Sequence, residues 1–291
     1  MNITYKVKAF GFTQAVSYLE KNREKYNCNI PWAILLDPTS ACNLQCKGCW
    51  AAEYGHKLNL SYEDIDSIIE QGKALGIYLY IYTDDNWNDV SSEAFYDKII
   101  DMGALFVWFF HYMPLGKSAV PELMVTPEQR LELCGRIRGF RKTKPIFVMD
   151  FQNDAQHVGG CIAGGRRYLH INAAGDVDPC VFIHYSNVNI HDCTLLEALR
   201  SPIFMDYHDG QPFNDNMLRP CPMLENPELL SEMVRKTGAN STDPQAPESA
   251  EELCARTAEY AKRWPPVAEQ LWHDYTCCTG CSQCPNAEGS V

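Results

Sequence analysis

The chain has 291 residues, of which 46% are hydrophobic and 21% charged, and this composition excludes a disordered chain. Its formal net charge of -12 argues against nucleic acid or an anionic membrane as a partner, since both attract a concentrated excess of lysine and arginine. The first residues lack the apolar core of an export signal, and no stretch approaches the ~20 apolar residues of a membrane span. We therefore expect a soluble, cytoplasmic protein with no membrane span.

Helix and strand patterns alternate through the first half of the chain. An amphipathic helix is predicted at about residues 13–26, and the apolar residues 32–37 form the first predicted strand. Beyond a loop, Ser61 and Asp64 are spaced as a capping box that starts a helix, which leads into a second strand at residues 77–83.

Two more helix–strand units follow. Ser91 or Ser92 caps the first helix, Thr126 caps the second, and their strands cover residues 105–112 and 145–151. In the second helix the spacing predicts three inward-facing side chains, Leu131, Cys134 and Ile137. Helices that alternate with strands imply a parallel sheet, so we expect an α/β fold.

The sequence changes character after Asp154. Residues 168–172 and 177–183 are predicted to form a β-hairpin, and short helices are predicted near residues 194–200 and 250–262. We therefore expect three parts: a helical segment at residues 1–30, an α/β domain at residues 31–154 and a small cysteine-rich α+β domain at residues 155–291.

The chain has 14 cysteines but no export signal, which favours thiolates that bind metal over a disulfide scaffold. Cys42, Cys46 and Cys49 stand in the order C-x3-C-x2-C soon after the first predicted strand, where open α/β sheets place ligands. A [4Fe-4S] cluster is normally held by four thiolates, so three on one loop leave one iron open to another ligand. The alternative is a structural zinc site, which would need a fourth ligand such as His56.

These residues, Cys-Asn-Leu-Gln-Cys-Lys-Gly-Cys, resemble the cluster-binding loop of the radical S-adenosylmethionine (SAM) superfamily. The resemblance implies a partial (β/α) barrel in which Cys42, Cys46 and Cys49 hold a [4Fe-4S] cluster whose open iron binds SAM. It also implies reductive cleavage of SAM to a 5'-deoxyadenosyl radical that acts on a substrate, with electrons from a donor such as flavodoxin or ferredoxin. Trp50 would then cover the adenine of SAM.

A second resemblance covers the C-terminal part. The segment Cys-Ile-Ala-Gly that begins at Cys161, and the Pro-Cys that ends at Cys180, resemble the SPASM or twitch extensions of radical SAM enzymes. This resemblance implies a second iron–sulfur cluster with Cys161, Cys180 and Cys221 as ligands, and Cys254 is our first choice for the fourth. The alternatives for that fourth ligand are His184, Cys193 and the C-terminal tail.

The other cysteines have two interpretations. Cys28 and Cys134 are predicted to be buried structural thiols. The tail carries cysteines at a C-x2-C-x2-C spacing that occurs in iron–sulfur and zinc sites, so a third metal site is an open alternative: Cys277, Cys278, Cys281 and Cys284.

The barrel implied by the first resemblance is incomplete in this chain. In the family the second strand ends in a Gly-Gly-Glu motif that receives the amino group of SAM, but no such motif occurs here, and strand 77–83 runs into Asp84 and Asp85. Residues 50–160 hold three further predicted strands, fewer than a six-stranded partial barrel requires at about 30 residues per unit. We therefore predict an internal deletion close to residues 83–86 and a shortened partial barrel.

Three functions are compatible with the sequence. The first is a radical SAM enzyme that acts on an unknown substrate of the peptide, tetrapyrrole or lipid class, with His111 and Tyr112 at a strand end as candidate site residues. The second is a non-catalytic iron–sulfur protein that has lost SAM binding through the deletion. The third is a zinc-binding interaction protein.

Overall fold

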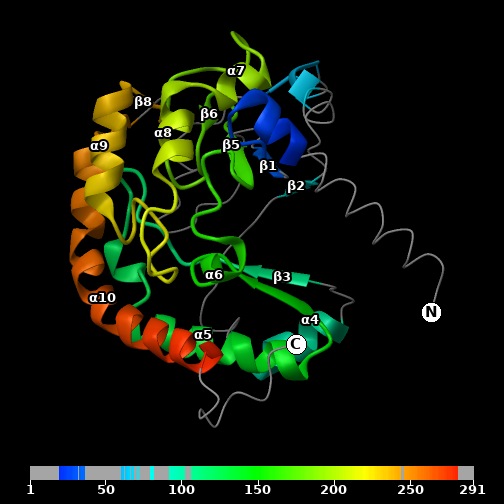
Figure 1. The fold of residues 1–291 in the computed structure, drawn as a ribbon, viewed down its shortest axis with the longest axis vertical. Coiled ribbons are helices and arrows are strands. Elements are labelled where there is room, and N and C mark those ends of the chain that lie inside the picture. Colours follow the sequence, from blue (N-terminus) through cyan, green and yellow to red (C-terminus); the bar gives the residue numbers. More distant parts are fainter. Residues whose placement is uncertain are drawn as a thin grey trace, which may run out of the picture.

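The computed structural model describes residues 20–31, 33–36, 60–61, 63–65, 67–68, 71, 79–81, 92–101, 106–243 and 246–280. Within these residues the fold is mixed α/β, with small sheets and no closed barrel (Figure 1). None of the helices in this part of the chain is long and apolar enough to cross a bilayer.

The largest sheet holds strands in the order β2-β1-β5-β6. β1 (Ala33–Leu36) pairs in parallel with β2 (Leu79–Ile81) on one side and with β5 (Tyr168–Ile171) on the other. β6 (Val177–Asp178) pairs antiparallel with β5, which confirms the predicted hairpin. One sheet therefore contains strands from both sides of residue 154, where we placed a domain boundary from the sequence.

The hairpin turn has the residues that its geometry requires. Gly175 adopts a φ of +89°, a left-handed conformation that favours glycine. The Asn172 side chain accepts hydrogen bonds from the backbone N–H groups of Ala174 (2.9 Å) and Asp176 (3.0 Å). This turn fixes where the chain leaves β6 and so where Cys180 lies.

A separate sheet holds two parallel strands, β3 (Phe106–Phe109) and β4 (Phe147–Asp150) (Figure 1). Within the described residues no strand pairing joins them to β1 or β2. The expectation of one parallel sheet is therefore wrong for these residues, and the division falls between β2 and β3. A third sheet pairs β7 (Tyr185–Ser186) with β8 (Asn240–Ser241).

The predicted helix starts are confirmed where the structure describes them. α4 (Glu93–Asp101) follows Ser92, whose hydroxyl accepts a hydrogen bond from the Phe95 N–H (3.1 Å). α5 (Pro127–Thr143) begins with the capping box of Thr126 and Gln129. Ser61 and Asp64 also form a capping box, in which the Ser61 N–H donates to Asp64 (2.9 Å) and the Asp64 N–H donates to the Ser61 hydroxyl (3.1 Å).

The buried face of α5 differs from the prediction. Arg130, Leu133, Cys134 and Ile137 are buried, whereas the side chain of Leu131 is 41% exposed. The prediction that Leu131 faces inward is wrong. The helix instead turns Arg130 into the core, where polar partners surround the guanidinium.

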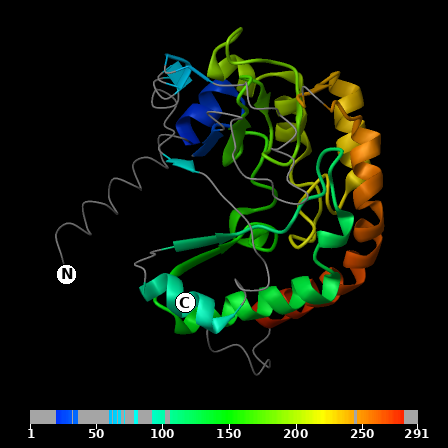
Figure 2. The same cartoon turned by 180° about the vertical axis from the view of Figure 1, so that it is seen from behind.

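The remaining helices lie after η2 (Pro121–Leu123) and are α6 (Ala155–Val158), α7 (Leu195–Leu199), α8 (Pro202–Gly210), α9 (Pro227–Thr237) and α10 (Ala250–Gly280). α10 continues well beyond the helix predicted at residues 250–262. It packs against α9 near one end and against α5 near the other (Figures 1 and 2). This long helix therefore connects the region of the four-stranded sheet with the region of β3 and β4.

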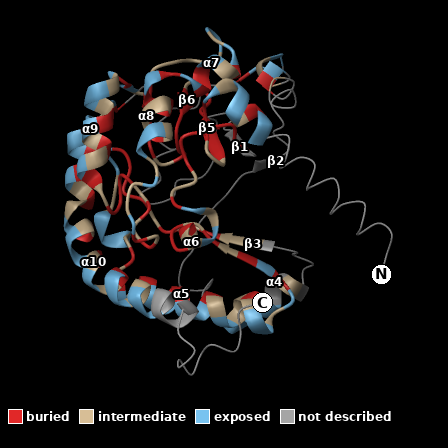
Figure 3. Ribbon diagram, in the orientation of Figure 1, coloured by how far each residue is buried: buried red, intermediate tan, exposed pale blue. Residues whose placement is uncertain are grey.

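Two hydrophobic cores are present in the described residues. The larger one joins the four-stranded sheet to α7, α8, α9 and α10, and the buried residues follow the inner faces of these elements (Figure 3). The smaller one packs α4 and α5 against β3 and β4 around Tyr96, whose ring centroid lies 4.2 Å from that of Phe140 and 5.8 Å from that of Phe109.

Candidate metal centre

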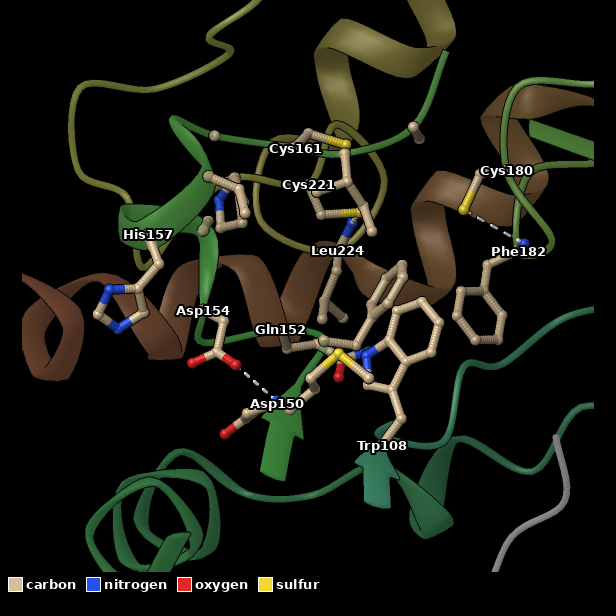
Figure 4. A pocket seen from close by; sticks show the side chains of 18 of the residues that line it. Trp108, Asp150, Gln152, Asp154, His157, Cys161, Cys180, Phe182, Cys221 and Leu224 are labelled. Carbon is tan, nitrogen blue, oxygen red and sulfur yellow. Dashed lines mark hydrogen bonds between the residues drawn. The ribbon is translucent and has the colours of Figure 1, made fainter. Parts of the chain in front are cut away.

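A pocket of about 1090 Å³ lies between β4 and the segments that follow α6, β6 and α8. Apolar side chains form most of its wall, and the rings of Trp108 and Phe182 are among them (Figure 4). Cys161, Cys180 and Cys221 also line it. The structure thus brings three of the four cysteines predicted to bind the second cluster to one pocket.

The three thiols come from different segments but share one local arrangement. Cys161 follows α6, Cys180 follows β6, and Cys221 lies between α8 and α9. A backbone N–H from two or three residues further on donates to the sulfur of Cys180 (Phe182, 3.5 Å) and to that of Cys221 (Leu224, 3.4 Å), and the backbone of Ala163, two residues after Cys161, lowers the pKa of the Cys161 thiol. Such donors stabilise the negative charge of a thiolate.

Burial raises the pKa of all three thiols. The pKa of Cys161 is raised to about 11 and that of Cys180 to about 12, and the pKa of Cys221 is raised well above its ordinary value. The thiol of Cys161 raises the pKa of both others further, so the three groups lie within electrostatic reach of one another. They are protonated near neutral pH, and a metal that binds them must displace their protons.

Side chains fix the loop around Cys161 through its carbonyl groups. The guanidinium of Arg166 donates to the carbonyls of Val158 (2.8 Å), Gly160 (2.8 Å) and Cys161 (2.7 Å). Gln211 adds a second donor to the Cys161 carbonyl (3.1 Å). The backbone that carries this thiol is therefore held from both sides.

Cys180 and Cys221 each have a further polar neighbour. The sulfur of Cys180 lies 2.6 Å from the hydroxyl oxygen of Tyr168. The backbone N–H of Cys221 donates to the carboxylate of Glu225 (2.7 Å), and Asn226 donates to the Cys221 carbonyl (3.0 Å). The position of Cys221 therefore depends on where Glu225 is held.

Arg130 holds Glu225 from the interior. Its guanidinium donates to Glu225 (2.6 Å) and to the Tyr260 hydroxyl (3.1 Å), and it lies 4.0 Å from the centroid of the Trp264 ring. Its other N–H groups donate to the Asn153 side chain (2.8 Å) and to the carbonyls of Gln152 (3.0 Å) and Leu218 (3.1 Å). Burial lowers the pKa of Arg130, but Tyr260 and Glu225 raise it above its ordinary value, so the guanidinium stays charged. Burial raises the pKa of Glu225, and Arg130 opposes that shift.

The sequence interpretation missed Arg130, Glu225, Tyr168 and Gln211 as residues that support the site. Arginine is among the residues least often fully buried, so composition gives no reason to expect it inside. One signal was available, because Arg130 precedes the inward-facing Cys134 by four residues and Ile137 by seven, the spacing of one helix face.

Cys254 is not brought to the pocket. It is buried on α10, where burial raises the pKa of its thiol and Ser231 of α9 lowers it, and it does not line the pocket. The alternatives are also engaged elsewhere: the Cys193 thiol donates to the Asn189 carbonyl (3.3 Å), and His184 Nε2 lies 2.9 Å from the Val181 carbonyl oxygen.

Other predicted residues lie apart from the pocket. Cys28 and Cys134 are buried as expected, at 1% and 3% exposure. The His111 ring is buried, neither of its nitrogens has a hydrogen-bond partner in the described part of the chain, and burial lowers its pKa well below the ordinary value. The Tyr112 hydroxyl accepts a hydrogen bond from the Val120 N–H (2.9 Å).

Several predicted residues fall outside the described part of the chain. They are Cys42, Cys46, Cys49 and Trp50 of the first loop, Asp84 and Asp85, and Cys281 and Cys284 of the tail. The backbone at Cys277 and Cys278 belongs to the end of α10.

The donor set fits an iron–sulfur cluster better than one metal ion. All seven cysteines whose side chains are described are free thiols. In the described residues no group of three His, Cys, Asp or Glu side chains lies close enough together to hold a single ion. A cluster spreads its thiolates over several iron atoms, and hydrogen bonds to its sulfurs are a usual part of such sites. The three thiols of the pocket supply three of the four thiolates that such a cluster normally takes.

Comparison of the chain with protein-family models, with curated proteins and with solved structures found no match. Functional inference therefore depends on the residues of the pocket and on the sequence motifs.

Proposed function

We propose that this chain is an iron–sulfur protein of the radical SAM type, in which Cys161, Cys180 and Cys221 hold a second, auxiliary cluster. One observation carries the proposal: three thiols from three separate segments line one pocket, and the sulfurs of Cys180 and Cys221 each accept a backbone N–H hydrogen bond. Incidental buried cysteines would have no reason to share this arrangement.

The residues around the pocket have distinct parts in holding such a cluster. When bound, an iron–sulfur cluster supplies one-electron transfer at a potential set by its surroundings. The backbone donors stabilise the thiolates, the guanidinium of Arg166 fixes the Cys161 loop, and Glu225 fixes the N–H of Cys221.

The first cluster is proposed from the sequence motif. The loop of Cys42, Cys46 and Cys49 comes soon after the carboxyl end of β1, which has parallel neighbours on both sides. Ligand sites of open α/β sheets lie at this end of the strands. On this proposal SAM binds at the first cluster, and an electron donor such as flavodoxin or ferredoxin supplies the reducing electron. The aromatic pocket favours a substrate with a large apolar part, within the peptide, tetrapyrrole or lipid classes.

A second candidate function is a cluster-binding protein that does not cleave SAM. The division of the parallel strands between β2 and β3 favours it, because the predicted deletion at residues 83–86 falls in the same interval. On this view the parallel strands β1, β2, β3 and β4 are what remains of a partial barrel, and the contacts to SAM that the missing units would provide are lost.

Anaerobic reconstitution with iron and sulfide tests the proposal. In a variant with Cys42, Cys46 and Cys49 all changed to Ser, we expect one cluster to remain, and we expect a further Cys161→Ser or Cys221→Ser change to abolish it. Cys193→Ser is the matched control, because this thiol bonds a backbone carbonyl outside the pocket. Bound zinc without acid-labile sulfide, or equal iron uptake by all variants, would refute the auxiliary site.

Electron paramagnetic resonance of the reduced protein separates the two candidate functions. A cluster signal from the unaltered chain that changes when SAM is added, and is absent from the Cys42, Cys46 and Cys49 variant, would support the radical SAM function. A signal that is indifferent to SAM would support the second candidate.

A further inference from the structure

Tyr207 on α8 has a buried hydroxyl that the described structure leaves without a partner. The residue is 0% exposed, and its hydroxyl oxygen makes no hydrogen bond to any described residue. A buried hydroxyl without a partner has lost its hydrogen bonds to water and gained none in return, so native proteins rarely keep one without a reason.

The Tyr207 ring lies directly behind the segment that carries Cys161. A β-carbon added at Gly164 would come within 2.4 Å of three carbon atoms of the Tyr207 side chain. Gly164 also donates its N–H to the carbonyl of Pro179 (2.9 Å), the residue before Cys180. The ring therefore packs against the segment that carries Cys161, and that segment pairs with the residue before Cys180.

Further contacts tie Tyr207 to the same site. Its carbonyl accepts a hydrogen bond from the N–H of Gln211 (3.2 Å), whose side chain donates to the Cys161 carbonyl. Phe213 packs edge-on at a centroid distance of 5.3 Å and restrains the ring. Burial raises the pKa of Tyr207 well above its ordinary value and four thiols raise it further, those of Cys161, Cys180, Cys221 and Cys254. The hydroxyl therefore keeps its proton and lies within electrostatic reach of sulfur atoms.

Tyr96 is a second buried tyrosine, and its surroundings differ from those of Tyr207. Its hydroxyl is also buried with no partner in the described residues, but its ring packs among the aromatic rings of the smaller core. The charged groups that affect its pKa are Arg141 and Asp150, and no cysteine is among them. Tyr207 differs because its ring packs against the segment that carries Cys161, and the groups that raise its pKa besides burial are thiols, three of which line the pocket.

We propose that the Tyr207 hydroxyl donates a hydrogen bond to a sulfur of the cluster held by Cys161, Cys180 and Cys221, and so raises the reduction potential of that cluster. The inference rests on the auxiliary cluster proposed above. A hydrogen bond to sulfur stabilises the reduced state, which carries one more negative charge than the oxidised state. The bond also supplies the partner that the hydroxyl lacks.

The test compares Tyr207→Phe with Tyr96→Phe in full-length protein in which Cys42, Cys46 and Cys49 are Ser. Metal-free Tyr207→Phe is expected to unfold at the same temperature as its parent or higher, because the lost hydroxyl had no partner. After reconstitution, it is expected to show a more negative midpoint potential and about tenfold faster loss of the cluster to a chelator. Tyr96→Phe is expected to leave potential and chelation rate unchanged.

Two results would overturn the inference alone. One is a reconstituted Tyr207→Phe protein with the potential and chelation rate of its parent. The other is a metal-free Tyr207→Phe protein that unfolds well below its parent, since the hydroxyl would then have had a partner without the cluster. A parent that takes up no iron and sulfide would overturn the proposed auxiliary site and this inference together.

Discussion

Arg130 and Tyr207 are both completely buried near the same pocket. They differ in hydrogen bonding, because Arg130 has a partner for every donor and the Tyr207 hydroxyl has no partner in the described residues. Each guanidinium N–H group of Arg130 has an acceptor. These acceptors include the Glu225 carboxylate and the Leu218 carbonyl. The Tyr207 hydroxyl has no hydrogen-bond partner in the described residues, and burial raises the pKa of the Cys161, Cys180 and Cys221 thiols. The two regions meet at Cys221, whose N–H bonds to Glu225.

This difference in hydrogen bonding distinguishes residues that support the fold from residues that can bind a ligand. A buried network with every partner present holds its members in one arrangement and gains nothing from a ligand. A buried group with an unused donor gains a hydrogen bond when a suitable acceptor arrives. The Arg130 network therefore positions the loop of Cys221, while the thiols and Tyr207 are the groups that would interact with a bound cluster.

The largest expected effect comes from breaking the closed network. Arg130→Met leaves Glu225 as a buried charge without its partner, so the free energy of unfolding should fall by about 3–5 kcal/mol, measured by chemical denaturation. Arg136→Met removes the exposed pair with Glu132 and should cost less than about 1 kcal/mol. Equal costs for the two variants would show that the buried network does not stabilise the fold.

Gly164→Ala tests the packing on the thiol side. Gly164 has a φ of +65°, and the new β-carbon would meet the Tyr207 side chain at 2.4 Å, so we expect a loss of about 2–5 kcal/mol in unfolding free energy. Gly238→Ala is a matched control, with a φ of +66° and no atom within 4 Å of the added carbon. It should cost only the backbone strain, about 1–2 kcal/mol. A Gly164→Ala protein no less stable than Gly238→Ala would contradict this placement of Tyr207.

Asp150 lies where the network reaches the pocket, and it should make stability depend on pH. It accepts a hydrogen bond from Asn153 (2.8 Å), and burial raises its pKa from 3.8 to about 6. The folded state therefore holds this proton more tightly than the unfolded state does. The stability gained from the protonated form is complete below about pH 4 and is lost as the pH rises through about 6.

Asp150→Asn isolates this dependence because the amide stays neutral. Relative to the unaltered protein, the variant should gain up to about 3 kcal/mol of unfolding free energy between about pH 4 and pH 8. Denaturant titrations of both proteins across this range provide the measurement. A difference that does not change with pH would mean that Asp150 is ionised in the folded state throughout.

The smallest expected effect comes from the N-terminal cap of α5, the helix that carries Arg130. The Thr126 side chain accepts the N–H of Gln129 (3.2 Å), so Thr126→Ala should lower the unfolding free energy by about 1 kcal/mol. Ser201 also stands at a helix start, before α8, but makes no side-chain cap hydrogen bond. Ser201→Ala should therefore be close to neutral in the same denaturation assay, and a loss as large as that of Thr126→Ala would disagree with the cap geometry.

Local features of the fold were predictable from the sequence because they depend on neighbouring residues. The capping boxes at Ser61 and Thr126, the hairpin at residues 168–178 and the alternation of helix and strand all follow from short spacings. The pairing of β1 with β5 and the division of the parallel strands depend on residues far apart, and no local spacing encodes them.

The candidate site was predictable only in part. The cysteine spacing and the hairpin indicated that Cys161 and Cys180 would come together, and the structure places them with Cys221 in one pocket. The choice of Cys254 had no spacing behind it, and that residue lies elsewhere. Arg130 was missed because the prediction followed hydrophobicity to Leu131, whereas the satisfied guanidinium, not the leucine, occupies the core.

The pairing of β1 with β5 has a consequence for synthesis on the ribosome. Ala33 of β1 pairs with Tyr168, and the nearby Asn29 side chain donates to the carbonyl of Gly164, 135 residues further along the chain. Contacts between such distant residues form late and slow folding, and a chain emerges with its N-terminal end first. We therefore expect the first strand to wait for its partner until the second half of the chain has been made, so that the sheet assembles after translation of the hairpin and not as the first strands emerge.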